Sequence, residues 1–330
     1  MRKLLFSAFA LASFGTISSA QTITTQTFGS GANAFSIDFV TIGNPGNVAD
    51  TTGNPNPVGS VAYTYNLGKY EVSRDMVTKA STAGGLGLNM VDLSYYVGGN
   101  GSNQPAMGIS WNEAARFVNW LNESKGYQKA YKFTTSGAND NLSVWGAGQY
   151  VGNNQFRHKD AYFFLPSRDE WHKGAYYDPS KSGGAGYWNF ATKSDTAPLA
   201  VSGGTTSGTA VYNGSFTGQN NIPSDITNAG GLSAYGTMAQ NGNSWEWTES
   251  ASDGINDLAY ENRDLRGGNY FNGSGFLDAS YRGTFYPTEE SFSVGYFGFR
   301  VASIPEPSSL SVLLIGVAGV ASRRLLKRKD

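Results

Sequence analysis

Two stretches of this chain carry a complete helix start signal, and they limit the helical part of any fold it can adopt. Ser110 stands three residues before Glu113, and Ser167 three residues before Glu170. In such a capping box, each side chain satisfies a backbone N–H group that the first helical turn leaves without a partner. A weaker signal begins at Ser73. The sequence therefore predicts two capped helices and a third, weaker one.

The remaining segments predict short strands and extensive loops. Polar and apolar side chains alternate over 35–42 and 62–70, and 162–165 is a brief apolar run. The chain has 43 glycines, and 14% of its residues are aromatic, a combination typical of irregular loops that are each fixed by a large side chain. Residues 179–236 are predicted to be such a loop region inside the domain, because YWNF and AVYN within it favour burial. We expect one α+β domain.

The two ends of the chain predict export rather than folding. Residues 1–20 begin with two basic residues, continue with an apolar stretch and close on Ser-Ser-Ala, which is the pattern of a secretory signal peptide. Residues 305–330 contain an apolar run over 310–321 and then a basic tail. This run is shorter than the roughly 20 residues of a spanning helix, and basic residues after an apolar segment tend to stay cytoplasmic. We expect the tail to hold the protein in the inner membrane before sorting.

This C-terminal pattern resembles the PEP-CTERM sorting signal of Gram-negative bacteria, with Pro305-Glu306-Pro307 as its motif. The resemblance implies processing by an exosortase, with cleavage near the motif. It also implies export to the cell envelope or to an extracellular matrix that contains exopolysaccharide. A plain membrane anchor is the alternative. In either case, residues 21–304 remain as the folded domain.

Charge and cysteine content exclude several classes of function. Within 21–304, acidic residues outnumber basic ones by six, so the surface is unsuited to phosphate backbones and we expect no nucleic-acid partner. The chain has no cysteine, so the exported domain must be stabilised by its core or by bound ions. It has neither a phosphate-binding glycine loop nor a Gly-x-Ser-x-Gly elbow.

Eight segments, in order from Asp38 to Ala302, resemble the formylglycine-generating enzyme, or sulfatase-modifying factor, family. They are DFVTIGNPGNVAD, LGKYEVSRDMV, PAMGISWNEAARFVNWLN, LPSRDEWHKGAYY, NGNSWEWTES, LRGGNYF, SYRG and FGFRVAS. The resemblance implies a variant of the C-type lectin fold, with short antiparallel strands, two or three helices and much irregular loop.

Glu246 stands between two tryptophans in NGNSWEW, and it needs a partner if it is buried. The resemblance implies calcium as that partner, bound by the carboxylate of Glu246 and by backbone oxygens of Gly242 and Ser244. A second calcium site implied by the family would use Asn213. Hard cations favour several such oxygen ligands. The family's Asn or Asp seven residues before the glutamate is Ala239 here, so one ligand is missing.

A buried ion pair is the alternative for Glu246, with Arg266 or Arg300 as the cation. We also expect Arg282 and Arg300 to hold internal carboxylates rather than ligand.

The resemblance also bears on catalysis. Formylglycine-generating enzymes oxidise a substrate cysteine with two cysteines of their own that bind copper, and these positions match Asn272 and Leu277. Soft Cu(I) cannot be held there without thiolates, so we expect no copper and no such oxidase activity. Ergothioneine-pathway sulfoxide synthases share this domain but use several histidines, whereas this chain has only His158 and His172.

These observations lead to three hypotheses. The first is a non-catalytic recognition domain that binds carbohydrate or peptide through aromatic side chains on loops. The second is a divergent enzyme that acts on a peptide or sulfated substrate, and the third is a matrix component without a discrete ligand. For the enzyme, the acidic candidates near Asn272 are Asp278, Glu289 and Glu290. For recognition, we expect two or three exposed rings among Trp188, Tyr270, Phe271, Phe285 and Tyr286, with Tyr281 and Tyr296 beside them.

Overall fold

The structure is a computed structural model that describes residues 22–94, 100–137, 141–214, 222–289 and 296–305. The predicted signal peptide, the sorting signal from Glu306 onward and Glu290 lie outside these residues. In the described ranges, none of the helices has the length and apolar character needed to cross a membrane.

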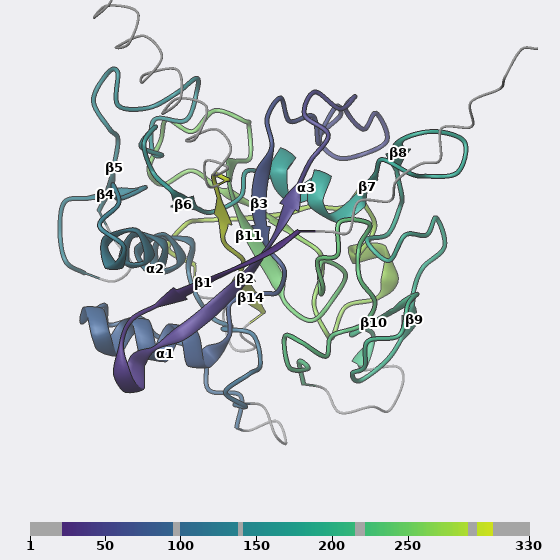
Figure 1. Ribbon diagram of the computed structural model, residues 1–330, viewed down its shortest axis with the longest axis horizontal. Coiled ribbons are helices and arrows are strands. Elements are labelled where there is room, and N and C mark those ends of the chain that lie inside the picture. The colour runs from purple at the N-terminus through teal and green to yellow at the C-terminus, as the bar shows by residue number, and fades with distance from the viewer. Residues whose placement is uncertain (1–21, 95–99, 138–140, 215–221, 290–295, 306–330) are drawn as a thin grey trace, which may run out of the picture.

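The first sheet contains the N-terminal strands and the last strand of the domain. Its order is β1-β2-β3-β15-β6, and all neighbouring strands are antiparallel. In Figure 1, β1 and β2 run side by side across the molecule. Strand β2 coincides with the predicted alternation, whereas β3 covers only part of the predicted 62–70. The strands are β1 (Ile23–Phe28), β2 (Phe35–Ile42), β3 (Tyr65–Gly68), β15 (Ala302–Ser303) and β6 (Phe163–Phe164).

The second sheet has the order β13-β12-β11-β14. Strands β11 and β14 are parallel, and the other neighbours are antiparallel. Only Arg300 and Val301 separate β14 from β15, so the chain passes directly from the second sheet into the first. The strands are β13 (Gly283–Phe285), β12 (Arg263–Arg266), β11 (Trp245–Ala251) and β14 (Phe297–Phe299).

Three pairs of two-residue strands organise the loops around the sheets. The pairs are β4 (Lys132–Phe133) with β5 (Leu142–Ser143), β7 (Tyr177–Asp178) with β8 (Gly186–Tyr187), and β9 (Leu199–Ala200) with β10 (Thr209–Ala210). The predicted loop region is mostly irregular, and Phe190 and Tyr212 within it are buried as expected.

Three α-helices begin at the predicted caps: α1 (Arg74–Gly84), α2 (Trp111–Ser124) and α3 (Arg168–Tyr176). Both capping boxes are complete, and Ser73 accepts a hydrogen bond from the first turn of α1. Helix α1 ends at Gly85 in the left-handed conformation that glycine favours. Two short 3-10 helices, η1 (Gly31–Asn33) and η2 (Ser274–Phe276), complete the elements.

The main core lies between α2 and the sheets. The ring of Phe117 on α2 packs edge-on against Phe299 of β14 at 5.4 Å and stacks on Phe35 of β2 at 6.1 Å. Both sheets therefore pack on the same helix.

Candidate functional site

A groove of about 450 Å³ lies at the second sheet, beside Asn272. Its volume is within the range of small-molecule sites, roughly 300–1,000 Å³. The wall residues come from β11, β12, η2, β13, β14 and the loops between them. They are Trp245, Leu265, Asn272, Phe276, Tyr281, Gly283, Phe285, Glu289, Tyr296 and Phe297.

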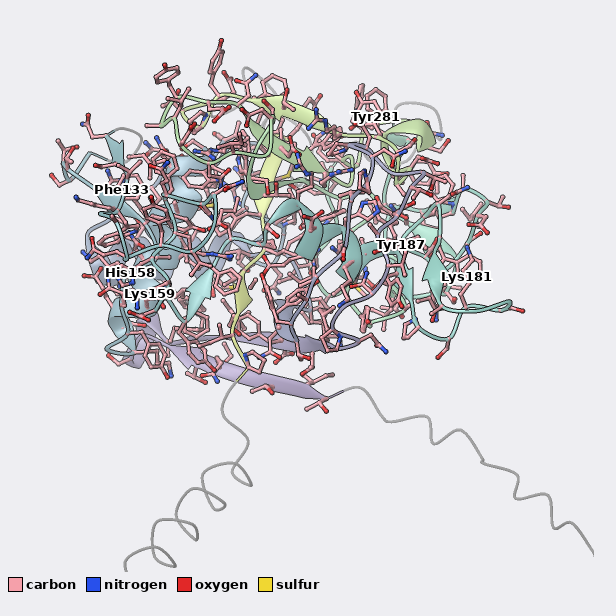
Figure 2. All side chains as sticks on the ribbon, turned by 90° about the horizontal axis from the view of Figure 1, so that it is seen from above. Phe133, His158, Lys159, Lys181, Tyr187 and Tyr281 are labelled. Atoms are coloured by element: carbon pink, nitrogen blue, oxygen red, sulfur yellow. The ribbon has the colours of Figure 1, made fainter. Side chains whose placement is uncertain are left out.

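Aromatic rings form most of this groove. Trp245 and Phe297 are buried, while Phe276, Tyr281 and Phe285 are exposed. The centroids of Phe276 and Tyr281 lie 4.7 Å apart, and those of Phe285 and Phe297 lie 4.9 Å apart. Figure 2 shows Tyr281 at the surface of the molecule. The groove thus offers several ring surfaces to a ligand.

Asn272 and Glu289 are the polar side chains without an aromatic ring among the described residues of the groove. Asn272 Oδ1 accepts from the backbone N–H of Asn269 at 3.1 Å, and the Asn272 N–H donates to Asn269 Oδ1 at 2.9 Å. This reciprocal pair fixes the side chain, and Asn272 Nδ2 makes no hydrogen bond to any described residue. The half-buried Glu289 likewise makes no ion pair with the described part of the chain.

The two positions that match the family's cysteines have different environments. Asn272 lines the groove, and its carbonyl accepts from the N–H of Asn213 at 2.8 Å. Leu277 is fully buried in an apolar cluster with Phe190 and Tyr212. The described residues contain no cysteine, so neither position offers a thiolate.

Three of the seven predicted aromatic candidates, Tyr281, Phe285 and Tyr296, line the groove, and the other four do not. Four of the seven rings are exposed, not two or three as predicted: Phe271, Tyr281, Phe285 and Tyr286. The expectation was too low because the loops around β13 leave more ring surface outside the core than the composition indicated. Tyr270 is buried, and of the five principal candidates only Phe285 lines the groove.

Trp188 belongs to a different part of the molecule. Its Nε1 donates to Asp178 at 3.1 Å, and Lys181 Nζ lies 4.0 Å from the centre of its ring. The side chain is therefore engaged by neighbours around β7 and β8, and it is not among the groove residues.

The acidic candidates for catalysis are also separated. Asp278 Oδ1 accepts from the N–H and the hydroxyl of Ser280, at 2.8 and 2.6 Å, and so stabilises its own turn. Of Asp278 and Glu289, only Glu289 lines the groove.

Glu246 is fully buried, and Arg300 is its cation. Arg300 Nε lies 2.5 Å from Glu246 Oε2, and Arg300 Nη2 donates to Glu246 Oε1 at 2.5 Å. Trp171 Nε1 adds a hydrogen bond to Oε2 at 2.7 Å. The predicted alternative of an ion pair with Arg300 is confirmed.

Arg266 is the cross-strand neighbour of Glu246, but its side chain turns elsewhere. It donates to the backbone carbonyls of Asn54, Ala279 and Tyr281. Burial lowers the pKa of Arg266 to about 10. Because Tyr281 lines the groove, this buried guanidinium also fixes one groove wall.

The calcium candidates lie next to one another but do not form a complete site. The N–H of Asn243 donates to the carbonyl of Val211, which brings Gly242 and Ser244 close to the segment of Asn213. Ala239 is buried and offers no side-chain ligand. Both oxygens of Glu246 are taken by Arg300, and no group of three or more acidic or histidine side chains suited to a metal occurs in the described ranges. These residues fit an internal ion pair better than calcium, which stays a prediction.

Glu71 is a buried acid that the sequence reasoning missed. Its carboxylate accepts from Asn243 Nδ2 at 2.6 Å and from the Ser244 N–H at 3.1 Å. Burial, together with the nearby charge of Glu246, raises the pKa of Glu71 well above its usual range. It holds the NGNSWEW segment in place, and no sequence pattern around it indicated this role.

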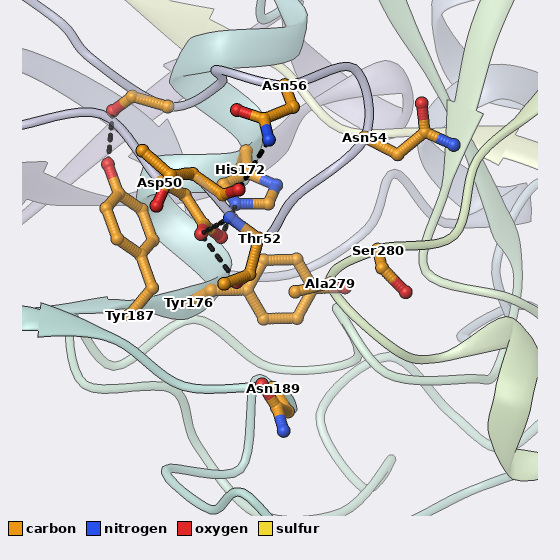
Figure 3. A network of polar contacts seen from close by, with 12 residues as sticks. Asp50, Thr52, Asn54, Asn56, His172, Tyr176, Tyr187, Asn189, Ala279 and Ser280 are labelled. Carbon is orange, nitrogen blue, oxygen red and sulfur yellow. Dashed lines mark hydrogen bonds and ion pairs between the residues drawn. The ribbon is translucent and has the colours of Figure 1, made fainter.

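His172 has a structural role in the core. Its Nε2 lies 2.9 Å from Asp50 Oδ2, while the N–H and hydroxyl of Thr52 donate to Asp50 Oδ1 (Figure 3). Burial lowers the pKa of His172 to about 4. For Asp50, burial acts to raise the pKa, but hydrogen bonds from His172 and Thr52 prevail and lower it to about 2. A neutral His172 thus donates to a charged Asp50 at neutral pH.

Comparison with known proteins supports the fold and the family. Residues 39–304 match the sulfatase-modifying factor enzyme 1-like domain. No curated protein matches the chain.

Three solved structures show the same architecture. Treponema denticola variable protein 1 has 18% identity and a TM-score of 0.54, over 86% of this chain and 99% of the neighbour. CarF has 19% identity and a TM-score of 0.57, over 82% of this chain and 99% of the neighbour. PvdO from Pseudomonas aeruginosa has 17% identity and a TM-score of 0.52, over 85% of this chain and 98% of the neighbour.

At these identities the structural likeness shows the fold alone, which is the predicted variant of the C-type lectin fold. The family match is independent of it and extends from within β2 to just beyond β15. The chain therefore belongs to the sulfatase-modifying factor enzyme 1-like family.

Proposed function

We propose that this protein is an exported, surface- or matrix-associated recognition domain that does not generate formylglycine. In this proposal, carbohydrate or peptide binds in the groove at Asn272. The predicted export signals support a location outside the inner membrane, and exopolysaccharide is the candidate ligand there.

The observation that carries the proposal is the character of the groove. One of the two positions that match the family's copper-binding cysteines is Asn272, and the chain has no cysteine at all. Around that position the walls are aromatic, with exposed Phe276, Tyr281 and Phe285. Exposed rings on a rigid scaffold favour binding of sugar rings or apolar side chains over redox chemistry.

A divergent enzyme remains the second hypothesis. It requires a pair of titratable groups that act together in the groove. Only Glu289 provides one among the described candidates, because Asp278 stabilises its own turn. The arrangement therefore favours recognition.

The test is binding of the purified protein to the extracellular polysaccharide of the organism that makes it. Tyr281→Ala removes a groove ring, and we expect roughly tenfold weaker binding, about 1.4 kcal/mol. Tyr260→Ala is the matched control, because Tyr260 is 70% exposed and does not line the groove. Binding that does not saturate, or equal affinity of the two variants for the polysaccharide, would contradict the proposal.

The same assay addresses calcium, when it is run with calcium and then with a chelator. Loss of binding on chelation would support a calcium-organised site and make Glu246 the first residue to substitute. Binding unaffected by the chelator would agree with the ion pair to Arg300 as the only cation at Glu246.

A further inference from the structure

We propose that the groove at Asn272 selects a positively charged amino sugar. In this inference, aromatic walls contact the sugar ring and Glu289 binds its ammonium group. The inference rests on the proposed carbohydrate recognition and names the class of sugar.

The first argument is the charge balance of the groove. The described residues that line it include one acid, Glu289, and no lysine, arginine or histidine. No basic side chain in the described ranges pairs with Glu289, which is half-buried beside apolar rings. A carboxylate in such surroundings gains more from a cation than one in open water does, because the interaction is less screened and the hydrogen bond is charge-assisted.

The second argument is that no cation of the described residues lies over a ring of the groove. The chain places its own cations over several aromatic rings elsewhere, but none of the described cation–π pairs involves a ring of the groove. Those pairs involve Phe28, Tyr70, Trp111, Phe133, Phe156, Phe164 and Trp188. The C–H groups of a sugar, made more positive by a neighbouring ammonium, can therefore pack on Tyr281 and Phe285.

The third argument is that the groove has a hydrogen-bond donor for a neutral part of the same ligand. The Asn272 Nδ2 group has no acceptor in the described residues, while Asn269 fixes the position of the side chain through Oδ1 and the backbone N–H. A sugar hydroxyl is a suitable acceptor. Carboxylate, amide and ring surface thus match an ammonium, a hydroxyl and a pyranose ring.

A second groove provides the contrast. It has about 490 Å³ and lies between α2 and β4, lined by the basic Arg116, Lys129 and Lys132 and by one acid, Glu123. Its excess of basic side chains disfavours a cationic sugar. The excess of six acidic residues over 21–304 adds a long-range attraction for a cationic polymer, and Glu289 offers such a polymer a local contact in the groove at Asn272.

The experiment compares an oligomer of glucosamine with its fully N-acetylated form, by calorimetry on the full chain at mildly acidic pH, where the amines are protonated. Acetylation removes the charge and leaves the sugar backbone unchanged. We expect the glucosamine oligomer to bind roughly five to ten times more tightly, as a partly buried charged hydrogen bond implies. Equal affinity for the two oligomers would overturn the inference.

Two variants test whether Glu289 provides the negative charge that binds the ammonium group. Glu289→Gln should remove the preference for the glucosamine oligomer, and Glu123→Gln, the same change in the other groove, should leave it intact. If Glu289→Gln keeps the preference, the inference is wrong. If both oligomers bind equally and Tyr281→Ala weakens both, the amino-sugar inference fails and carbohydrate recognition by the groove stands. If neither oligomer binds while the native polysaccharide does, the amino-sugar inference fails and the proposed carbohydrate recognition stands.

Discussion

Glu246 and Arg300 show what a single buried pair does in this fold. Arg300 lies where the chain passes from β14 to β15, and its guanidinium also donates to the carbonyls of Gly68 and Met238. One side chain thus joins the two sheets and a loop through Glu246. Burying two charges costs solvation, and the pair is stable only while each keeps its partner.

Arg300→Met should therefore lower the free energy of unfolding by about 3–5 kcal/mol, because it leaves Glu246 buried without a cation. Arg282→Met is the matched control. Arg282 pairs with Asp264 at 3.2 Å, but Asp264 keeps a second partner, Arg168, at 2.9 Å. We expect a clearly smaller loss for Arg282→Met in chemical denaturation; an equal loss in both variants would contradict this view of Arg300.

At the scale of elements, the capping box of α2 connects a helix to a distant loop. Glu113 is fully buried, and its Oε2 accepts from the Ser110 N–H at 3.0 Å. Its Oε1 accepts from the N–H of Asn89 at 2.9 Å. The carboxylate therefore starts the helix and also holds the segment after α1 against it.

Ser110→Ala should destabilise the protein by about 1–2 kcal/mol, because the Glu113 N–H then loses its partner at a buried helix start. Ser124→Ala, at the exposed other end of α2, should change stability by less than about 0.5 kcal/mol. Thermal unfolding of the two Ser→Ala variants checks this. If Ser124→Ala costs as much as Ser110→Ala, the cap is not the source of the effect.

At the scale of the whole molecule, two buried groups give stability opposite dependences on pH. Burial lowers the pKa of His172 from 6.5 to about 4. The unfolded chain then takes up the proton first, and stability is lost as pH falls from 6.5 towards 4. Burial raises the pKa of Glu249 from 4.5 to about 7, against the lowering effect of Arg157. Here the folded protein holds the proton, and stability is lost as pH rises from 4.5 to 7.

Relative to His172→Gln, the free energy of unfolding of the wild-type protein should fall by about 3 kcal/mol as the pH is lowered from 7 to 4. Relative to Glu249→Gln, the free energy of unfolding of the wild-type protein should fall by a similar amount as the pH rises from 4.5 to above 7. Urea denaturation across this range measures both differences. Parallel curves for the wild-type protein and both variants would refute the assignment.

The sequence alone was sufficient for features whose cause lies within a few residues. The starts of α2 and α3 follow from a serine and a glutamate three positions apart, and β2 follows from its alternation. The two flanking tryptophans indicated only that Glu246 would need a partner if it were buried, and its burial came from the structure. The lack of thiolates at Asn272 and Leu277 follows directly from the composition.

Tertiary structure alone decided which distant residues meet. The sequence left Arg266 and Arg300 as equal partners for Glu246. The strand register makes Arg266 the nearer backbone neighbour, yet the guanidinium of Arg300 reaches the carboxylate from the turn between the sheets. In the same way, the aromatic content indicated a binding surface made of rings, but it could not show that Phe285 lines the groove while Trp188 lies elsewhere. Local signals act through neighbouring backbone groups, whereas the pair and the groove depend on how segments more than 50 positions apart pack together.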